Sequence, residues 1–129
     1  MPDATSYPVR RIMVTGSRDW TDRVTIDRAL FAYWYEAGRP SDILLIHGGA
    51  RGADALAAAS WTTQGFQTRV YPADWETFGK RAGVIRNLAM LDKEPEHVLA
   101  FIKGNSPGAT HAALAAERRG IPVTYYRED

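Results

Sequence analysis

The sequence predicts an α/β protein: a three-layer, doubly wound sandwich with a mostly parallel sheet of five strands. Two observations lead to this prediction. Short apolar runs alternate along the chain with segments of helical periodicity, which is the pattern of repeated β-α units. The second of these runs, Ile43–His47, is continuous rather than alternating in hydrophobicity, as expected for a strand buried on both faces of a parallel sheet.

Five apolar runs are predicted to be strands. In chain order they are Ile12–Thr15, Ile43–His47, Thr68–Tyr71, Val98–Ile102 and Val123–Tyr126. Helical segments separate them, so consecutive strands are joined by crossovers and pair in parallel.

The first helical pattern has apolar residues at helical spacing and signals at both ends. Thr21 is the expected N-cap, and Gly38 can end the helix in the left-handed conformation. The apolar positions are Ile26, Leu30, Trp34 and Ala37.

Three further helices are expected, over about Asp54–Gln64, Arg81–Leu91 and Thr110–Arg119. The first and last of these are rich in alanine and stop at a glycine, so they can approach the sheet closely. In the middle one, Val84, Leu88 and Leu91 are expected to form a single apolar face.

The chain has 129 residues, which supports one core and leaves no room for a second module. We expect a flexible tail over residues 1–10 and a single domain over residues 11–129. The formal net charge of +1 excludes proteins that bind polyanions through a large basic excess, so nucleic acid is not an expected partner.

Other classes are excluded by residues that the chain lacks. There are no cysteines, which excludes disulfides, thiolate nucleophiles and Cys-ligated zinc. The longest aliphatic run, Ile43–Ile46, is far shorter than the ~18–20 residues of a membrane span. Residues 1–8 show no signal-peptide pattern, so we expect a cytoplasmic protein without membrane contact.

Three strand-to-helix junctions carry the candidate site: Gly16–Trp20, His47–Asp54 and Lys103–Thr110. Each combines glycines with hydroxyl or guanidinium donors just before a helix, which is the composition of an anion-binding loop. In parallel sheets these junctions meet at one edge, where ligands bind. The candidate ligand-binding residues are Gly16, Ser17, Arg18, Asp19, His47, Gly48, Gly49, Gly52, Asp54, Arg86, Asn87, Ser106, Gly108 and Thr110.

Several of these residues have a second interpretation. Arg18 is predicted to contact phosphate, but it could instead pair with Asp19 or Asp54. Asp54 could touch a ribose hydroxyl, although we favour a role as N-cap of the second helix. His47 ends a buried strand, where a satisfied core imidazole is more common than a catalytic base.

The polar and aromatic side chains near these junctions are also ambiguous. Arg86 and Asn87 lie in a helix patterned for burial, so they reach either a ligand or an ion-pair partner. Trp20 and Trp75 fall in the candidate loops and could stack on a base, whereas Trp34 and Trp61 fall on helices and suit the core or a subunit interface.

The standard phosphate motifs are missing. The segment Gly48–Gly52 lacks the Gly-Lys-Ser/Thr ending of a P-loop, and the glycines do not follow Gly-x-Gly-x-x-Gly. This argues against a conventional ATPase or NAD dehydrogenase. No two histidines stand at ligand spacing, so we expect neither a metal site nor a cofactor.

Taken together and in this order, the motifs resemble the SLOG superfamily, named for the Smf/DprA and LOG proteins, and within it the small YspA-like branch. The resemblance rests on Gly16–Trp20, His47–Asp54, Arg86-Asn87 and the turn Gly108–Thr110, and it covers about residues 11–123. It implies a Rossmann-like sheet that binds a nucleotide or nucleotide-derived ligand, either a nucleoside phosphate or an ADP-ribose-like molecule, across the strand ends.

LOG enzymes of this superfamily remove ribose 5′-phosphate from nucleoside monophosphates. The segment Arg86–Met90 resembles their Arg-Lys-x-x-Met motif, with Asn87 in place of lysine, and implies that Arg86 holds the position of the catalytic arginine. Their second motif ends in a catalytic glutamate, but here the corresponding position is Ala113. Cleavage of an N-glycosidic bond usually needs a nearby carboxylate, so binding is expected to survive this change and catalysis is not.

The sequence thus predicts a nucleotide-binding protein, acting as a sensor or sequestering module. The alternative is a LOG-like phosphoribohydrolase in which Asp54 or Glu76 supplies the missing carboxylate. Single-stranded DNA binding is a third hypothesis, which the near-neutral charge and the lack of a basic, aromatic groove argue against. The resemblance also implies a homodimer, and the aromatic residues of the first helix, Phe31 to Tyr35, are consistent with one.

Overall fold

The structure is a computed structural model that describes residues 10–129. The flexible tail predicted for residues 1–10 therefore lies outside the described residues except for Arg10. That residue is part of the folded domain, because its guanidinium donates to both carboxylate oxygens of Glu96, at 2.8 and 2.7 Å. Its carbonyl also accepts the amide of Leu44, at 2.9 Å.

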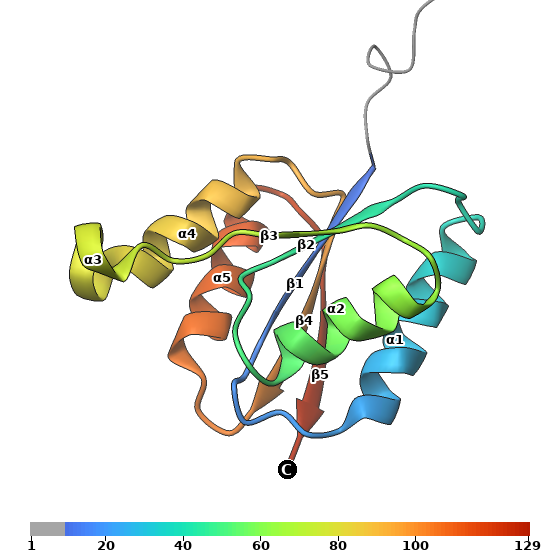
Figure 1. Cartoon of the computed structure of the whole chain (residues 1–129), viewed down its shortest axis with the longest axis horizontal. Helices are drawn as coiled ribbons and strands as arrows, with labels where there is room; N and C mark the ends of the chain where they lie inside the picture. Colours follow the sequence, from blue (N-terminus) through green and yellow to red (C-terminus); the bar gives the residue numbers. More distant parts are fainter. Residues whose placement is uncertain (1–9) are drawn as a thin grey trace, which may run out of the picture.

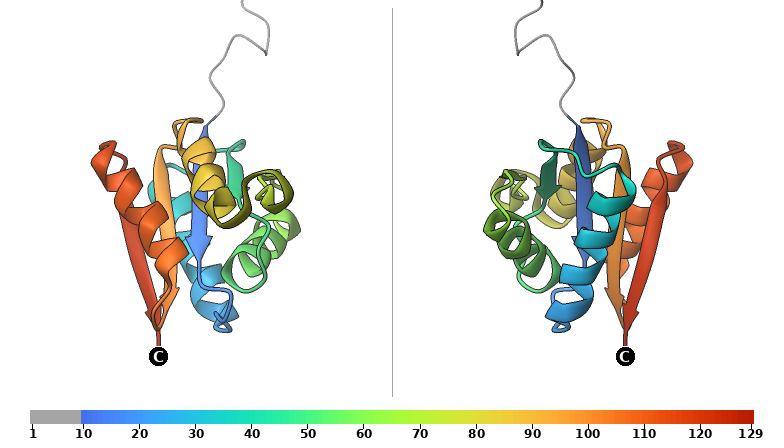
Figure 2. Two further views of the ribbon diagram at one scale, coloured as in Figure 1. Left: turned by 90° about the vertical axis from the view of Figure 1, so that its left-hand side faces the viewer. Right: turned by 90° about the vertical axis from the view of Figure 1, so that its right-hand side faces the viewer.

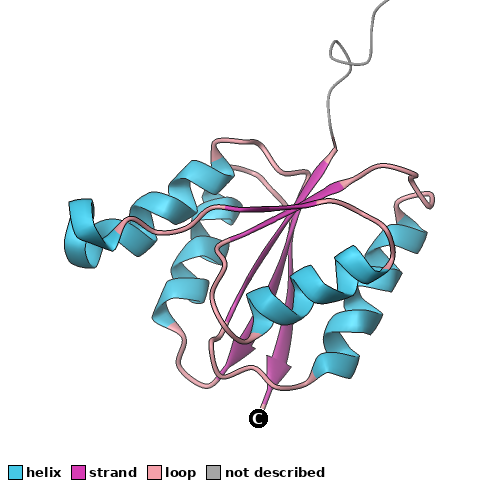
Figure 3. Cartoon of the chain, in the orientation of Figure 1, coloured by secondary structure: helices cyan, strands magenta, loops and turns pink. Residues whose placement is uncertain are grey.

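A five-stranded sheet forms the middle layer, between helices (Figure 3). The order of its strands is β3-β2-β1-β4-β5. Its strands are β1 (Arg11–Gly16), β2 (Leu44–His47), β3 (Thr68–Val70), β4 (His97–Lys103) and β5 (Val123–Glu128). All four pairings are parallel, so the prediction of a mostly parallel sheet is confirmed. The chain builds outward from β1 to one edge and then returns to build β4 and β5 on the other side.

Two pairs of helices cover the two faces of the sheet (Figures 1 and 2). The helices α1 (Arg23–Glu36) and α2 (Ala53–Thr63) pack on one face, and α4 (Ala82–Leu91) and α5 (Pro107–Arg118) pack on the other. A short helix, α3 (Trp75–Phe78), and a 3-10 turn, η2 (Gly79–Arg81), lead into α4. This is the predicted Rossmann-like three-layer α/β sandwich.

The central strand β1 shows why the apolar runs are continuous. Ile12 and Val14 face the core beneath α1 and α2, whereas Met13 faces the core beneath α4 and α5. All three side chains are fully buried. A strand covered on both faces needs apolar residues at every position.

The start of α1 differs from the prediction by one residue. Asp22, not Thr21, is the N-cap, and its carboxylate accepts the amide of Thr25 at 3.0 Å. Thr21 instead donates its amide and its hydroxyl to Glu128 at the end of β5, at 2.8 and 2.7 Å. A residue of either type can cap a helix, and the tertiary contact with β5 decides between them.

The prediction of an apolar face on α4 is wrong at Val84. This side chain is exposed, while Asn87 and Met90 are buried in its place. The amide of Asn87 donates to the carbonyl of Gly108 at 3.4 Å, which gives the buried polar group a partner. The helix is therefore turned so that Asn87 faces α5, and this matters for the site described below.

The last helix begins three residues earlier than predicted, at Pro107 rather than Thr110. Proline is well suited to the first helical position, because its missing N–H would have no partner there. Within residues 10–129, no helix is both long enough and apolar enough to cross a lipid bilayer.

Candidate functional site

A cavity of about 410 Å³ opens at the carboxyl ends of β1 and β4. These two strands are neighbours at the point where the strand order reverses, which is where open parallel sheets bind ligands. The segments after both strands line the cavity, and the start of α2 and the α3–α4 region complete it (Figure 1). The predicted site residues that line it are Gly16, Ser17, Arg18, Asp19, Asp54, Arg86, Asn87, Ser106 and Gly108.

Ser17 joins the two central loops of the site. Its hydroxyl oxygen accepts the amide of Lys103 at 2.7 Å, and it also forms a hydrogen bond with the hydroxyl of Ser106. The side chain is 5% exposed. Ser17 therefore lines the cavity, but its hydroxyl already holds the loop after β1 against the loop after β4.

The glycines on either side of this junction allow close packing. A Cβ at Gly16 would overlap with that of Ala53, at the start of α2. A Cβ at Gly52 would lie 2.5 Å from the carbonyl oxygens of Ser17 and Arg18, and the φ of Gly52 is +80°. Gly16 lines the cavity and Gly52 does not. At both positions the missing side chain allows the loop after β1 to pack closely against the start of α2.

The loop after β2 binds the chain's own side chains. Asp54 accepts the amides of Gly48 and Ala50 through Oδ2, at 3.1 and 3.3 Å. His47 accepts the amide of Gly49 through Nδ1, at 3.0 Å. These amides are not available to a phosphate group, and His47, Gly48 and Gly49 lie outside the cavity lining.

The favoured interpretation of Asp54 as the N-cap of its helix is wrong. Gly52 holds the cap position of α2, and Asp54 lies in the first turn with its side chain directed back to the preceding loop. Asp54 is 5% exposed, and its second oxygen, Oδ1, has no hydrogen-bond partner among the described residues.

Burial is the main cause of the pKa shifts of Asp54 and His47. It raises the pKa of Asp54 to about 6, although the amide of Ala50 and the charge of Arg86 oppose the shift. Burial also lowers the pKa of His47, and the charge of Arg86 lowers it further, so the imidazole is held neutral at pH 7. His47 matches the alternative of a satisfied, buried histidine.

Arg86 reaches the site from α4. Its Nη1 donates to the carbonyl of Gly48 at 2.8 Å, and its Nε donates to Oδ1 of Asn87 at 2.8 Å. A Cβ at Gly48 would overlap with the guanidinium, so this glycine makes room for Arg86. No hydrogen bond to residues 10–129 engages Nη2, and the side chain lines the cavity.

The first turn of α5 forms the wall opposite Asp54. Ser106 is the N-cap residue, but its hydroxyl donates to the carbonyl of Lys103 at 3.0 Å and does not cap the helix. The amides of Gly108 and Ala109 have no intrahelical partner at these positions, and both residues line the cavity. Thr110 is exposed and does not line it.

The remaining cationic and aromatic lining comes from two segments. Arg18 is exposed and forms no ion pair within residues 10–129. Of its two predicted partners, Asp19 pairs with Arg51 at 3.8 Å, and Asp54 accepts backbone amides. Lys80 and Trp75 line the cavity from the α3–η2 segment, and Trp75 is 50% exposed.

The prediction that Trp20 could stack on a ligand base is wrong. Trp20 is 2% exposed, donates its indole N–H to the carbonyl of Asp22 at 2.8 Å, and packs edge-on against Phe101. Trp61 is also a core residue, as predicted for a helical position.

Some lining residues were not among the predicted site residues: Thr15, Ala50, Lys80, Gly83, Val84, Met90, Asn105, Pro107 and Ala109, together with Trp75, which was considered only as a stacking surface. Lys80 belongs to a turn whose path is set by tertiary packing, so no sequence signal indicates it. Asn105, Pro107 and Ala109 follow directly from the predicted junction after β4.

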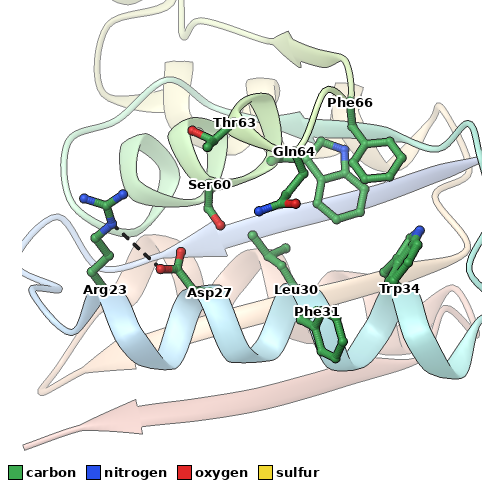
Figure 4. Close-up of a pocket in the computed structure, with 10 residues that line it drawn as sticks. Arg23, Asp27, Leu30, Phe31, Trp34, Ser60, Thr63, Gln64 and Phe66 are labelled. Atoms are coloured by element: carbon green, nitrogen blue, oxygen red, sulfur yellow. Dashed lines mark ion pairs between the residues drawn. The ribbon is translucent and has the colours of Figure 1, made fainter.

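A second cavity, of about 450 Å³, lies between α1 and α2 (Figure 4). Its aromatic lining includes Phe31, Trp34 and Phe66, and its one cationic side chain, Arg23, pairs with Asp27 at 3.8 Å. This cavity offers no unpaired cation to an anionic ligand. Residues 10–129 also contain no group of three or more His, Asp or Glu side chains that could hold a metal ion.

The position that corresponds to the LOG glutamate offers no catalytic group. Ala113 is fully buried in α5, packed with Ala100 and Ile102 of β4. Of the two alternative carboxylates, Glu76 is exposed and outside the cavity lining, and Asp54 lines the cavity.

Comparison with known proteins gives consistent results. Residues 10–78 match the YspA, cpYpsA-related SLOG family. The Gene 61 protein of Mycobacterium phage D29 is 41% identical over 120 residues, covering 89% of this chain and 94% of that protein. The fold resembles DNA processing protein A (DprA) from Streptococcus pneumoniae, with a TM-score of 0.52 at 13% identity over 90% of this chain. The chain spans 58% of that DprA chain.

Proposed function

We propose a binding function for this chain, which belongs to the YspA, cpYpsA-related SLOG family. In this proposal it binds a nucleotide or nucleotide-derived ligand in the cavity at the carboxyl ends of β1 and β4. The observation that carries this proposal is the convergence of Arg18, Arg86 and the first turn of α5 on one cavity of about 410 Å³. Nucleoside phosphates and ADP-ribose-like molecules are the ligand classes considered.

The phosphate is proposed to bind at the first turn of α5. The amides of Gly108 and Ala109 supply hydrogen-bond donors, and the helix N-terminus carries partial positive charge. Arg18 has no competing ion pair among the described residues and adds a charge-assisted donor. The loop after β2 does not contribute in this proposal, because Asp54 and His47 already accept its amides.

The base is proposed to bind on the apolar side of the same cavity. Trp75, Val84 and Met90 line it there, and half of the Trp75 surface is exposed. An indole face can stack on any nucleobase. A ligand with an anionic end and an aromatic end therefore fits both halves of the cavity.

Isothermal titration of the protein with AMP tests the proposal. Arg18→Ala should lower the affinity by about 10- to 100-fold, which corresponds to a charge-assisted hydrogen bond of about 1.5–3 kcal/mol. Arg69→Ala is the matched control, because Arg69 is an exposed arginine of β3 that lies outside the cavity lining and pairs with no carboxylate among residues 10–129. Equal affinities of Arg18→Ala and the wild type would remove Arg18 from the site.

A LOG-like hydrolase is the second candidate, and one observation favours it: the Asp54 carboxyl and Arg86 line the same cavity. Against it, Asp54 is committed to its loop through Oδ2, and Ala113 cannot transfer a proton. We expect no release of free base from AMP when the reaction is followed by chromatography. If the wild type releases free base and Arg86→Ala does not, the hydrolase becomes the favoured function.

Without turnover, binding itself is the proposed activity, as a sensor or a sequestering module for the ligand. We also propose a cytoplasmic location, where nucleotides are abundant. The chain contains no cysteine, so nothing in it depends on an oxidising compartment.

A further inference from the structure

We propose that Asp54 recognises a hydroxyl group of the ligand's sugar, which makes the site selective for ribonucleotides over deoxyribonucleotides. This inference rests on the proposed function, since it assigns a role within the same cavity. It adds a specificity-determining residue and narrows the class of ligand.

The two carboxylate oxygens of Asp54 have different surroundings. Oδ2 accepts two amides of the loop after β2, at 3.1 and 3.3 Å, which fixes the side chain in one orientation. Oδ1 has no hydrogen-bond partner among residues 10–129. Asp54 is only 5% exposed, yet it is one of the residues that line the cavity.

An unpaired buried acceptor is costly, at about 1–3 kcal/mol, and such groups concentrate at functional sites. A hydrogen-bond donor from the ligand would remove this cost. The amides that hold Oδ2 keep the side chain in place in the free protein. Less than 1 Å² of Oδ1 is accessible there, so a ligand hydroxyl reaches it by a small shift of the cavity lining.

The charges of the cavity limit what that donor can be. Arg18, Lys80 and Arg86 line it, and they disfavour a ligand whose donor is a cation. The open amides of Gly108 and Ala109 favour an anion on the opposite wall. A ligand that presents a phosphate to α5 and a neutral O–H to Asp54 meets both conditions, and a ribose phosphate combines these groups on one sugar.

The experiment compares AMP with 2′-deoxy-AMP and 3′-deoxy-AMP by isothermal titration. The wild type should bind AMP about 10- to 100-fold more tightly than at least one of the deoxy ligands, as expected for a hydrogen bond to a charged group. This comparison uses only the wild-type protein, so it does not depend on how a variant folds.

Asp54→Asn tests the residue. The asparagine oxygen can still accept the amides of Gly48 and Ala50, while its NH₂ group replaces the charged acceptor by a neutral donor. A neutral donor can form only a weaker, uncharged hydrogen bond with the oxygen of the sugar hydroxyl. The variant should therefore bind AMP no more than about 3-fold more tightly than the deoxy ligand. On a free-energy scale this is about half of the 10-fold preference that is the smallest expected for the wild type. Asp42→Asn makes the same change of charge at an exposed position outside the cavity lining and should keep the full preference.

The outcomes separate this inference from the proposed function. Equal binding of all three nucleotides by the wild type overturns the inference and leaves the proposed function standing. A full preference for AMP in Asp54→Asn also overturns it, because the preference then does not depend on the charged acceptor of Asp54. Failure of the wild type to bind any of the three nucleotides overturns both.

Discussion

Asp54 fills the position that an anionic ligand would take in the loop after β2. Its carboxylate accepts the amides of Gly48 and Ala50 at 3.1 and 3.3 Å, on the same chain. A glycine-rich turn before a helix therefore does not by itself mark a phosphate site, because a nearby carboxylate can occupy the amides. At the cavity, two amides of the first turn of α5, those of Gly108 and Ala109, have no intrahelical partner.

The burial of Asp54 predicts a pH-dependent cost to stability. Burial raises the pKa of Asp54 from its ordinary 3.8 to about 6 in the folded protein, so the folded state holds the proton more tightly. Stability then falls as the pH rises from about 4 to 6, and the full cost persists above this range. Asp54→Asn removes the titrating group and should melt at a higher temperature than the wild type at pH 7.5.

The gain should shrink towards pH 4, where the wild-type carboxyl is protonated in the folded protein. Thermal unfolding of both proteins at pH 4 and 7.5, with Asp19→Asn as control, measures the difference. The account would be contradicted if the gain in melting temperature of Asp54→Asn over the wild type were smaller at pH 7.5 than at pH 4.

At the residue scale, the sequence could predict which loops form the site but not how each side chain is used. Arg18, Arg86 and Asn87 were predicted as site residues, and they line the cavity. Gly48 was predicted to approach a phosphate, and it approaches the guanidinium of Arg86 instead. Both uses require a residue without Cβ, so a glycine in the sequence cannot distinguish them.

At the scale of elements, the short helix α3 carries the one aromatic side chain that lines the cavity, Trp75. Trp20 and Trp61 are 2% exposed and belong to the core. A nucleotide bound in the cavity should therefore quench the fluorescence of Trp75 selectively.

Titration with AMP should reduce the tryptophan fluorescence of the wild type, and Trp75→Phe should abolish most of the change while keeping a stacking surface. Trp34→Phe is the matched control, since Trp34 lines the other cavity, between α1 and α2. Quenching that persists unchanged in Trp75→Phe would place the base elsewhere.

The ends of the elements were predictable only to within a few residues. Asp22 and Thr21 are both good N-cap residues, and the contact of Thr21 with Glu128, 107 residues away in sequence, decides which one caps α1. Apolar spacing predicted that Val84 lies on the buried face of α4. Instead Asn87 is buried there, because its amide donates to the carbonyl of Gly108 on α5. Both errors come from tertiary contacts, which override local preference.

At the scale of the whole molecule, the alternation of apolar runs and helical patterns was sufficient to predict the fold. It could not predict the strand order, which leaves β1 and β4 as neighbours and brings Arg18 and the first turn of α5 together. The site depends on this order, because the amides of Gly48, Gly49 and Ala50 in the loop after β2 already have acceptors within the chain.

The outer face of α1 supports the prediction of a homodimer. Val24, Phe31 and Tyr35 are 57, 61 and 61% exposed, and with Arg28 they form one stripe opposite the buried residues of the helix. Their spacing of four, three and four residues is the same in both directions, so an antiparallel second copy would match it. Phe31 of this stripe also lines the cavity between α1 and α2 (Figure 4).

We expect sedimentation analysis to find a dimer at micromolar concentrations and Phe31→Asp to convert it to a monomer. Leu114→Asp places the same charge at an exposed leucine of α5 and should leave the dimer intact. A wild-type protein with the monomer mass throughout this range would refute the prediction.

The central claim is that a nucleotide binds at the switch between β1 and β4, with its phosphate on the first turn of α5. Titration of ¹⁵N-labelled protein with AMP, followed by amide chemical shifts, tests it most directly. The largest changes should appear at the amides of Gly108 and Ala109, and the amides of Gly48 to Ala50 should move less because His47 and Asp54 already accept them. Changes concentrated at Gly48 to Ala50, or no changes at α5, would contradict the claim.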